Sequence, residues 1–228
     1  MRDKYKIILM VVFLFIGLLV IFFGYDNNYV QSDALRFKGE YESLNGKSNK
    51  SGNNYLVVDI PDNNVIKYAS FEEIREVLTR KSGVIYFGFP ECPWCRNMIG
   101  PLLDSASKFD IKQIYYFNAH DIRDSKHLDD DGNIVVDYDG TSSYYELIDL
   151  MNDFLTPYEG LNDESIKRLY FPTVVFVKDG KIKDIHIGTV DEQSDPYIPL
   201  SSSQKNELID IFSNGIKKVV GTTCGDKC

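Results

Sequence analysis

Apolar residues along the chain follow three kinds of pattern, and each pattern predicts a different element. An uninterrupted apolar run over residues 7–24, without a charge or an amide, is typical of a membrane-spanning helix, since about 18 helical residues cover about 27 Å. Shorter apolar runs at residues 83–89 and 113–117 predict buried strands. Apolar residues at helical spacing predict amphipathic helices over about 71–80 and 204–219.

Charges on either side of the long apolar run predict its orientation. Basic residues lie within residues 1–6, and residues 26–28 are acidic or amide. Positive charge favours the cytoplasmic side, so we expect residues 1–6 to be a cytoplasmic stub and the rest of the chain to be extracellular. The alternative is a cleaved signal peptide, but residues 22–25 offer no small-residue cleavage site. We therefore expect residues 7–24 to remain as a single-pass anchor.

Polar sequence separates this anchor from the first predicted strands. Residues 25–54 are rich in Asn, Gly, Ser and Lys, which predicts a flexible linker. Residues 55–60 and 65–69 flank a Pro-Asp-Asn-Asn turn and predict a first hairpin or strand pair. The remaining length fits a single domain over residues 55–219, followed by a cysteine-containing tail at residues 220–228.

Capping and turn signals add further elements. Residues 70–73 form a capping box that opens the first predicted helix, and residues 143–146 form a second one. Alternating β-branched residues over 173–187 surround Asp179-Gly180 and predict a β-hairpin. A long insert, residues 118–170, precedes that hairpin.

Two cysteines lie where the buried strand at residues 83–89 gives way to a helix. In Cys92-Pro93-Trp94-Cys95, Pro93 suits the first position of the helix. The unpaired N–H groups and the positive dipole end of a helix N-terminus stabilise a thiolate, so Cys92 is the predicted nucleophile. Cys95 lies one turn further and is placed to resolve the mixed disulfide that Cys92 would form.

Alternative roles for this cysteine pair stay open at this point. Two cysteines at this spacing also begin zinc ribbons, and they can form a structural disulfide. The chain has four cysteines, and the other two are Cys224 and Cys228. This tail pair is compatible with a structural or incidental disulfide, a second redox pair that exchanges with Cys92 and Cys95, or a metal site. Redox use is favoured because paired cysteines suit an oxidising compartment, and we expect no cofactor and no resident metal.

The net charge of −9 serves to exclude some classes of binding partner. It argues against nucleic-acid binding and against a strongly basic membrane-binding patch. The expected partners are therefore protein or peptide thiols and disulfides, together with the membrane through the N-terminal anchor. The sequence does not determine the oligomeric state.

Taken together, the elements over about residues 55–219 resemble the thioredoxin-like superfamily, with membrane-anchored members in Gram-positive bacteria that include bacteriocin transport accessory proteins. The resemblance implies an α/β fold: a central mixed β-sheet flanked by helices, with a helical and loop insert, preceded here by one N-terminal transmembrane helix. It also implies that Pro172 is cis and packs beside the two cysteines, that Phe171 offers backbone hydrogen bonds to the substrate chain, and that Thr173 opens the hairpin.

Some residues depart from the pattern of that superfamily. Tyr86 stands six positions before the first cysteine, where thioredoxins have a buried aspartate that assists proton transfer. Trp94 follows Pro93, an arrangement closer to the aromatic residue of glutaredoxins, and Pro101 falls one place later than the kink proline of thioredoxins. Acidic Glu91 lies next to Cys92 and opposes its ionisation.

The leading hypothesis is an extracytoplasmic, membrane-anchored thiol–disulfide oxidoreductase, with the direction of electron flow unspecified. An alternative motivated by the insert is an accessory protein or chaperone for a secreted cysteine-containing peptide, as in bacteriocin-type export. A metal-binding thioredoxin-like protein is the third hypothesis.

Overall fold

A computed structural model describes residues 32–109 and 111–221 of the 228-residue chain. The predicted anchor at residues 7–24 and the tail cysteines Cys224 and Cys228 lie outside the described residues. Within the described part of the chain, no helix is both long enough and apolar enough to cross a bilayer.

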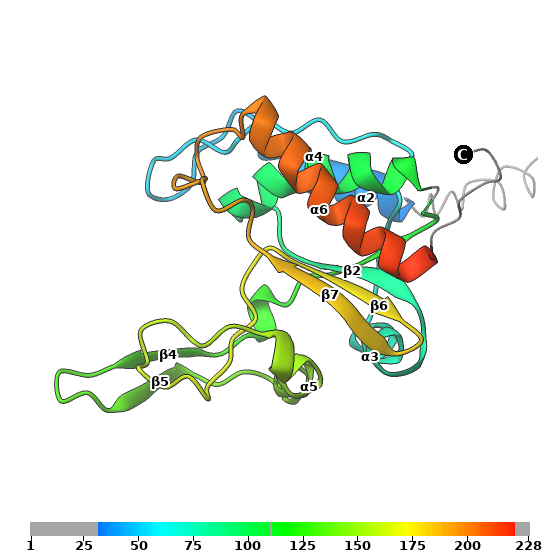
Figure 1. Ribbon diagram of the computed structural model, residues 1–228. Coiled ribbons are helices and arrows are strands. Elements are labelled where there is room, and N and C mark those ends of the chain that lie inside the picture. The colour runs from blue at the N-terminus through cyan, green and yellow to red at the C-terminus, as the bar shows by residue number, and fades with distance from the viewer. Residues whose placement is uncertain (1–31, 110, 222–228) are drawn as a thin grey trace, which may run out of the picture. The chain divides into compact units, whose positions relative to one another are not determined.

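A mixed five-stranded sheet with the strand order β1-β3-β2-β6-β7 lies at the centre of the domain (Figure 1). β3 runs parallel to both β1 and β2, whereas β6 is antiparallel to both β2 and β7. The strands are β1 (Ile66–Tyr68), β2 (Gly83–Phe87), β3 (Ile114–Phe117), β6 (Thr173–Lys178) and β7 (Lys181–Ile187). The chain therefore forms the predicted central mixed sheet.

Helices cover both faces of this sheet (Figure 1). One face packs against α2 (Asp33–Glu42), α4 (Pro93–Lys108) and α6 (Ser202–Val220), and the other packs against α3 (Phe71–Arg80) and α5 (Ser142–Met151). Side chains alternate along a strand, so β2 sends Tyr86 into the first core and Ile85 into the second. We name these two cores the α4 face and the α3 face.

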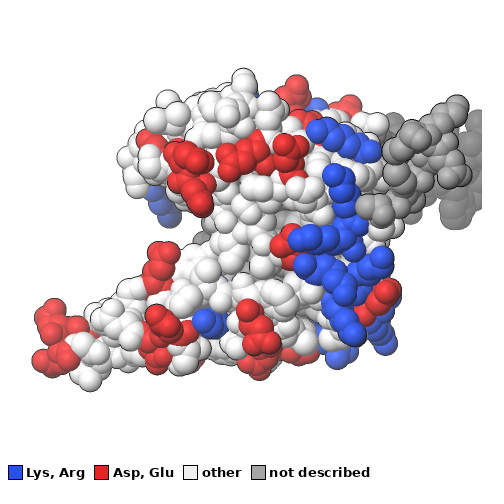
Figure 2. Space-filling view, viewed as in Figure 1, with Lys and Arg blue, Asp and Glu red and all other residues white. Residues whose placement is uncertain are grey.

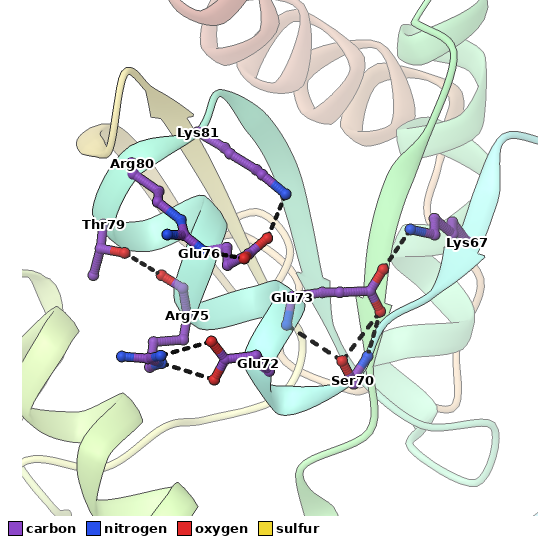
Figure 3. Close-up of polar contacts among 9 residues, drawn as sticks. All are labelled: Lys67, Ser70, Glu72, Glu73, Arg75, Glu76, Thr79, Arg80 and Lys81. Atoms are coloured by element: carbon purple, nitrogen blue, oxygen red, sulfur yellow. Dashed lines mark hydrogen bonds and ion pairs between the residues drawn. The ribbon is translucent and has the colours of Figure 1, made fainter.

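The start of α3 follows its predicted capping box. The Ser70 hydroxyl accepts a hydrogen bond from the Glu73 N–H at 3.3 Å, and the Glu73 carboxylate accepts one from the Ser70 N–H at 2.9 Å (Figure 3). Lys67 on β1 pairs with the same carboxylate at 2.6 Å (Figure 3). Ile74 of α3 is buried in the core of the α3 face, so this side of the helix packs against the sheet. Helix α6 begins with the same kind of box, formed by Ser201 and Gln204.

The predicted hairpin of β6 and β7 is confirmed. Asp179 and Gly180 form its turn with φ values of 53° and 67°. Gly180 is required there both for its positive φ and because an added Cβ would overlap the Thr79 carbonyl. Residues 174–177 of β6 are buried, and their side chains alternate between the two cores, Val174 on the α4 face and Val175 on the α3 face.

The prediction of a flexible linker over residues 25–54 is wrong for its described part. Helix α2 lies inside this range, and its Phe37 and Tyr41 are completely buried in the α4 face. Most of the other residues of α2 are charged and form ion pairs such as Arg36–Glu40, so the average composition of the helix hides its buried pair Phe37 and Tyr41. The domain therefore begins near Asp33 and not at residue 55.

The predicted hairpin over residues 55–60 and 65–69 is also wrong. Only β1 forms, and it pairs in parallel with β3. Residues 55–60 run extended without a strand partner because side chains take their backbone groups. The Asn45 amide donates to the Val58 carbonyl at 2.8 Å and accepts from the Val58 N–H at 3.1 Å.

The insert at residues 118–170 adds a hairpin and a helix to the domain, and the helix, α5, packs into the α3 face. A two-stranded antiparallel sheet of β4 (Ser125–Leu128) and β5 (Ile134–Tyr138) projects beside α5 (Figure 1). Short 3₁₀ turns η1 (His120–Ile122) and η2 (Asn152–Phe154) complete the insert. Thr141 is the N-cap of α5, two residues earlier than the predicted Ser143, and its hydroxyl accepts from the Tyr144 N–H at 3.3 Å.

Candidate functional site

Strand β2 ends at Phe87, and the turn that follows it places Cys92 at the start of helix α4. Cys92 is the N-cap of that helix, and its sulfur accepts a hydrogen bond from the Cys95 N–H at 3.1 Å. Pro93 occupies the first turn, as predicted, where its missing N–H costs nothing. An N–H group and the positive end of the helix dipole thus point at the Cys92 sulfur, and both interactions favour negative charge there.

The second cysteine lies deeper than the first. Cys95 is completely buried, whereas Cys92 keeps 4% of its surface exposed, and both are free thiols. Burial raises the pKa of the Cys95 thiol well above its ordinary value, and the neighbouring Cys92 raises it further. A backbone hydrogen bond from Phe89 and a side-chain hydrogen bond from Tyr86 act in the opposite direction. Cys92 is therefore the sulfur that a partner reaches, and Cys95 needs help to ionise.

The Phe171–Pro172 peptide bond is cis, as the resemblance implies. The Cys92 thiol donates to the Phe171 carbonyl at 3.7 Å, which places the cis-proline turn directly against the first cysteine. The Thr173 side chain does not join this contact, because its hydroxyl donates to the Tyr170 carbonyl at 2.8 Å and is buried. Thr173 fixes the turn before β6.

The remaining residues of the motif differ in exposure. Trp94 and Pro93 are half-buried, and Glu91 is exposed. All three lie at the turn into α4, so the structure brings the predicted motif residues together around Cys92. The predicted tail pair is outside the described residues.

Arg96 follows Cys95 and ties the turn to the N-terminal part of the domain. Its guanidinium donates to the backbone carbonyls of Leu56, Tyr41 and Pro90 at 2.7 Å, 2.8 Å and 3.2 Å, and to the side chain of Asn45 at 2.7 Å. It is 3% exposed, and this burial lowers its pKa. A buried cation with this many acceptors fixes the loop before Cys92.

An aromatic wall adjoins the cis-proline turn, and the insert contributes to it. The rings of Phe89 and Phe171 meet edge to face with centroids 5.5 Å apart. His120 lies 4.3 Å from the Phe89 ring, and the Arg123 guanidinium lies over the Phe171 ring at 4.9 Å. Flat apolar surface beside a nucleophilic sulfur suits the side chains of a bound polypeptide.

Tyr86 of β2 and Tyr41 of α2 form a buried tyrosine pair. The hydroxyls of Tyr86 and Tyr41 are 2.7 Å apart, and both side chains are completely buried. Gly88 makes this possible, because a Cβ at that position would overlap the Tyr86 hydroxyl. Burial raises the pKa of both tyrosines well above the ordinary value of 10.0.

Charge is distributed unevenly over the surface (Figure 2). Acidic side chains gather towards the side on which α4 begins, and they flank an uncharged recess next to the β4–β5 hairpin. Basic side chains gather at the opposite end of the sheet, near the turn between β6 and β7 (Figure 2).

The described residues give no support to a metal centre. Among residues 32–109 and 111–221, no group of three or more His, Cys, Asp or Glu side chains is arranged to hold a metal ion. Cys92 and Cys95 thus lack further metal ligands within this part of the chain.

Sequence reasoning missed three contributors to the site. Tyr41 fell in the expected linker, and its only signal was its spacing of four residues from Phe37. His120 and Arg123 lie in the insert, and no sequence pattern indicates that they contact the rings of Phe89 and Phe171. Tyr86, in contrast, was visible as a departure from the thioredoxin pattern.

Comparisons with known proteins add little to this description. No protein-family model and no curated protein matches the chain. Solved structures that it resembles include thioredoxin O2 from Arabidopsis thaliana in the oxidised state, with 18% identity and a TM-score of 0.34 over 56% of this chain and 85% of that one. Thioredoxin from Aeropyrum pernix gives 18% identity and a TM-score of 0.31 over 64% and 86%. The fold is defined by the strand order β1-β3-β2-β6-β7 and the helices on both faces of the sheet.

Proposed function

We propose that the protein is a thiol–disulfide oxidoreductase that uses the Cys92–Cys95 pair. The observation that carries the proposal is the position of Cys92, which caps α4, accepts the Cys95 N–H at 3.1 Å and lies 3.7 Å from the carbonyl of Phe171, before cis-Pro172. Cys92 attacks a disulfide of the partner, Cys95 resolves the mixed disulfide, and the reverse sequence transfers a disulfide to the partner. Phe171 and Pro172 align the partner chain.

The proposal extends to the location of the domain. The apolar run at residues 7–24 and the basic residues before it support a single-pass anchor with the domain on the extracytoplasmic side. Resistance of the full chain to extraction from membranes by carbonate, and release of a chain that begins at Asp33, would agree with this placement. A full chain recovered in the soluble fraction would contradict it.

Cysteine substitutions test the activity. Cys92→Ser should abolish disulfide exchange with insulin or glutathione, because the nucleophilic sulfur is lost. Cys95→Ser should retain the first attack and accumulate a mixed disulfide on Cys92, visible by mass. Serine is close to cysteine in size, so melting temperatures of both variants provide the control for folding. Exchange that persists in Cys92→Ser would refute the assignment.

A second candidate function is that of an accessory protein for one secreted, cysteine-containing peptide. The observation that favours it is the projecting β5 strand, on which the apolar side chains Ile134, Val136 and Tyr138 are 40%, 45% and 59% exposed. Within the described residues β5 pairs only with β4, so its outer edge is open to a further strand. Acidic residues surround it, including the turn at residues 129–131. The fitting occupant is an extended peptide with apolar and basic residues.

Two synthetic peptides test this candidate. Both carry one cysteine as a mixed disulfide with glutathione; one alternates Lys with Val, and the other alternates Glu with Val. The protein should reduce the basic peptide faster, and a Val136→Ser and Tyr138→Ser double variant, which removes exposed apolar contacts of β5, should reduce that peptide more slowly than the wild-type protein does. Val220→Ser, at the end of α6, is the matched exposed control. Equal rates for both peptides with the wild-type protein would rule the candidate out.

A further inference from the structure

Resolution of the mixed disulfide places a demand on Cys95 that the motif itself does not meet. Cys95 is completely buried, and burial opposes the thiolate that must attack. The side chain of another residue must therefore support ionisation of Cys95.

The α4 face supplies a hydroxyl pair at this place. Tyr86 lies at the end of β2, on the strand that leads into the cysteine turn, and a hydrogen bond from its side chain acts to lower the pKa of the buried Cys95 thiol. Tyr41 comes from α2, and its hydroxyl lies 2.7 Å from that of Tyr86. When Tyr86 donates to the cysteine sulfur, its oxygen is free to accept from Tyr41. The two hydroxyls then form a chain aimed at Cys95.

We propose that Tyr86 and Tyr41 form a buried hydrogen-bond relay that stabilises the Cys95 thiolate during resolution. Tyr86 contacts the reacting sulfur and is a catalytic residue, whereas Tyr41 acts through Tyr86 and is a positioning residue. This inference rests on the proposed oxidoreductase function. It also gives α2 a role in the chemistry, since that helix carries Tyr41 into the core.

The tyrosines act as donors and not as bases. Burial holds the pKa of each phenol well above 10.0, so both stay protonated near neutral pH. Hydrogen bonds to a charged acceptor are stronger than hydrogen bonds to a neutral one, so the pair favours the thiolate over the thiol.

The bonds and electrons of the resolving step balance without any further reactant. The Cys95 S–H bond breaks, and its proton passes to water. The Cys95 sulfur then forms a bond with the Cys92 sulfur, and the bond between Cys92 and the partner breaks. The electron pair leaves with the partner sulfur, which becomes a thiolate and takes up a proton from water. The cysteine pair is oxidised and the partner disulfide is reduced.

The local backbone is built around the Tyr86 hydroxyl. Gly88 lies between β2 and the cysteine turn, and a side chain at that position would occupy the space of this hydroxyl. The rings of Tyr41 and Tyr86 are also held by Phe37, whose centroid is 4.4 Å from the first and 6.4 Å from the second. The pair is thus fixed by packing before a partner arrives.

A two-phase reaction with an aromatic disulfide, dithionitrobenzoate, tests the relay. Attack by reduced Cys92 releases one coloured thiolate, and resolution by Cys95 releases the second. In Tyr86→Phe the first phase should be unchanged, whereas the second phase should slow by about tenfold and its pH midpoint should rise. Tyr41→Phe should change the second phase in the same direction by a smaller factor, about threefold.

Tyr116→Phe is the matched control within the same aromatic cluster. The Tyr116 ring lies 5.5 Å from that of Tyr86, but its buried hydroxyl has no hydrogen-bond partner in the described part of the chain. This variant should keep the wild-type second phase and pH midpoint. Cys95→Ser identifies the second phase by abolishing it, and melting temperatures verify that each variant is folded.

The possible results separate this inference from the proposed function. A wild-type protein that shows both phases, together with a Tyr86→Phe variant of unchanged second-phase rate and pH midpoint, overturns the relay alone. Equal slowing in Tyr116→Phe and Tyr86→Phe also overturns it, because the effect would then come from packing. A wild-type protein without a first phase contradicts the oxidoreductase function and the relay with it.

Discussion

The two faces of the central sheet are built from different chemistry. The fully buried side chains that the sheet sends to the α3 face are apolar, such as Ile85 and Val175, and the buried tyrosine of that face, Tyr144, comes from α5. The α4 face receives the buried hydroxyls of Tyr86 and Tyr116 on neighbouring strands, and the partly buried His186 packs beside Phe212 of α6. Because a buried polar group costs free energy unless it is paired, this polarity needs a reason.

The contrast indicates that one face supplies stability and the other also serves the cysteines. Cys95 and the Tyr41–Tyr86 pair lie on the α4 side, where burial alone would otherwise keep the thiol protonated. The apolar α3 face holds α3 and α5 against the sheet by hydrophobic contact. Substitutions on the two faces should therefore have different signatures.

The largest expected effect on stability comes from the α3 face. Ile85→Ala removes a completely buried side chain between β3 and β6 and should lower the free energy of unfolding by about 2–4 kcal/mol. It should leave the pH midpoint of disulfide resolution in place. Urea unfolding and the two-phase assay measure both properties, and Val57→Ala, at a side chain 76% exposed, is the control. A shifted pH midpoint of disulfide resolution in Ile85→Ala would contradict the separate roles of the α3 face and the α4 face.

A smaller effect, on chemistry, is expected next to Tyr86. Gly88→Ala places a Cβ on the Tyr86 hydroxyl and should displace it, so the second phase should slow by about tenfold, as in Tyr86→Phe. Gly100→Ala, in α4, is the control because nothing lies within 4 Å of its added Cβ, and it should raise helix stability by about 0.5–1 kcal/mol. Wild-type resolution in folded Gly88→Ala would argue against a role for the hydroxyl position.

The smallest expected effect is a pH dependence of stability from His186. Burial lowers its pKa below the ordinary 6.5, although its hydrogen bond to the Thr189 carbonyl and the carboxylates of Asp184 and Asp191 act in the opposite direction. The unfolded chain therefore binds the proton more tightly. The resulting stability is complete above the unfolded pKa and is lost as the pH falls through the lower, folded pKa.

Melting curves at about pH 7 and pH 5 test this dependence. The fall in melting temperature between them should be smaller in His186→Gln than in the wild-type protein, with His127→Gln as the variant of an exposed histidine. An equal fall in wild type and His186→Gln would show that other groups govern acid stability.

Most regular elements could be predicted because their signals are local. The capping box at Ser70 and the Asp179-Gly180 turn specify their structures within a few residues, and both are found as predicted. Helix α2 was missed because only Phe37 and Tyr41 mark its buried side. Residues 55–60 have strand-like composition, yet Asn45 and Arg96 occupy their backbone groups, and this competition is invisible in sequence.

The site residues also divide into those with local sequence signals and those that depend on contacts between distant segments. The cysteine spacing and the buried strand before it predict the cap at Cys92, and the family resemblance predicts the cis bond before Pro172. The contacts of Phe171 with Arg123 and of Tyr86 with Tyr41 join segments far apart in the chain. Such pairings depend on how α2 and the insert pack, which no local pattern encodes.

A redox titration tests the central claim most directly. The described domain is equilibrated with glutathione buffers of stepped potential, alkylated to trap free thiols, and its Cys92–Cys95 peptide is weighed. We predict a single two-electron transition between the dithiol and an intramolecular Cys92–Cys95 disulfide, absent from Cys92→Ser and Cys95→Ser. A peptide that carries two alkylated thiols at every potential would contradict the account.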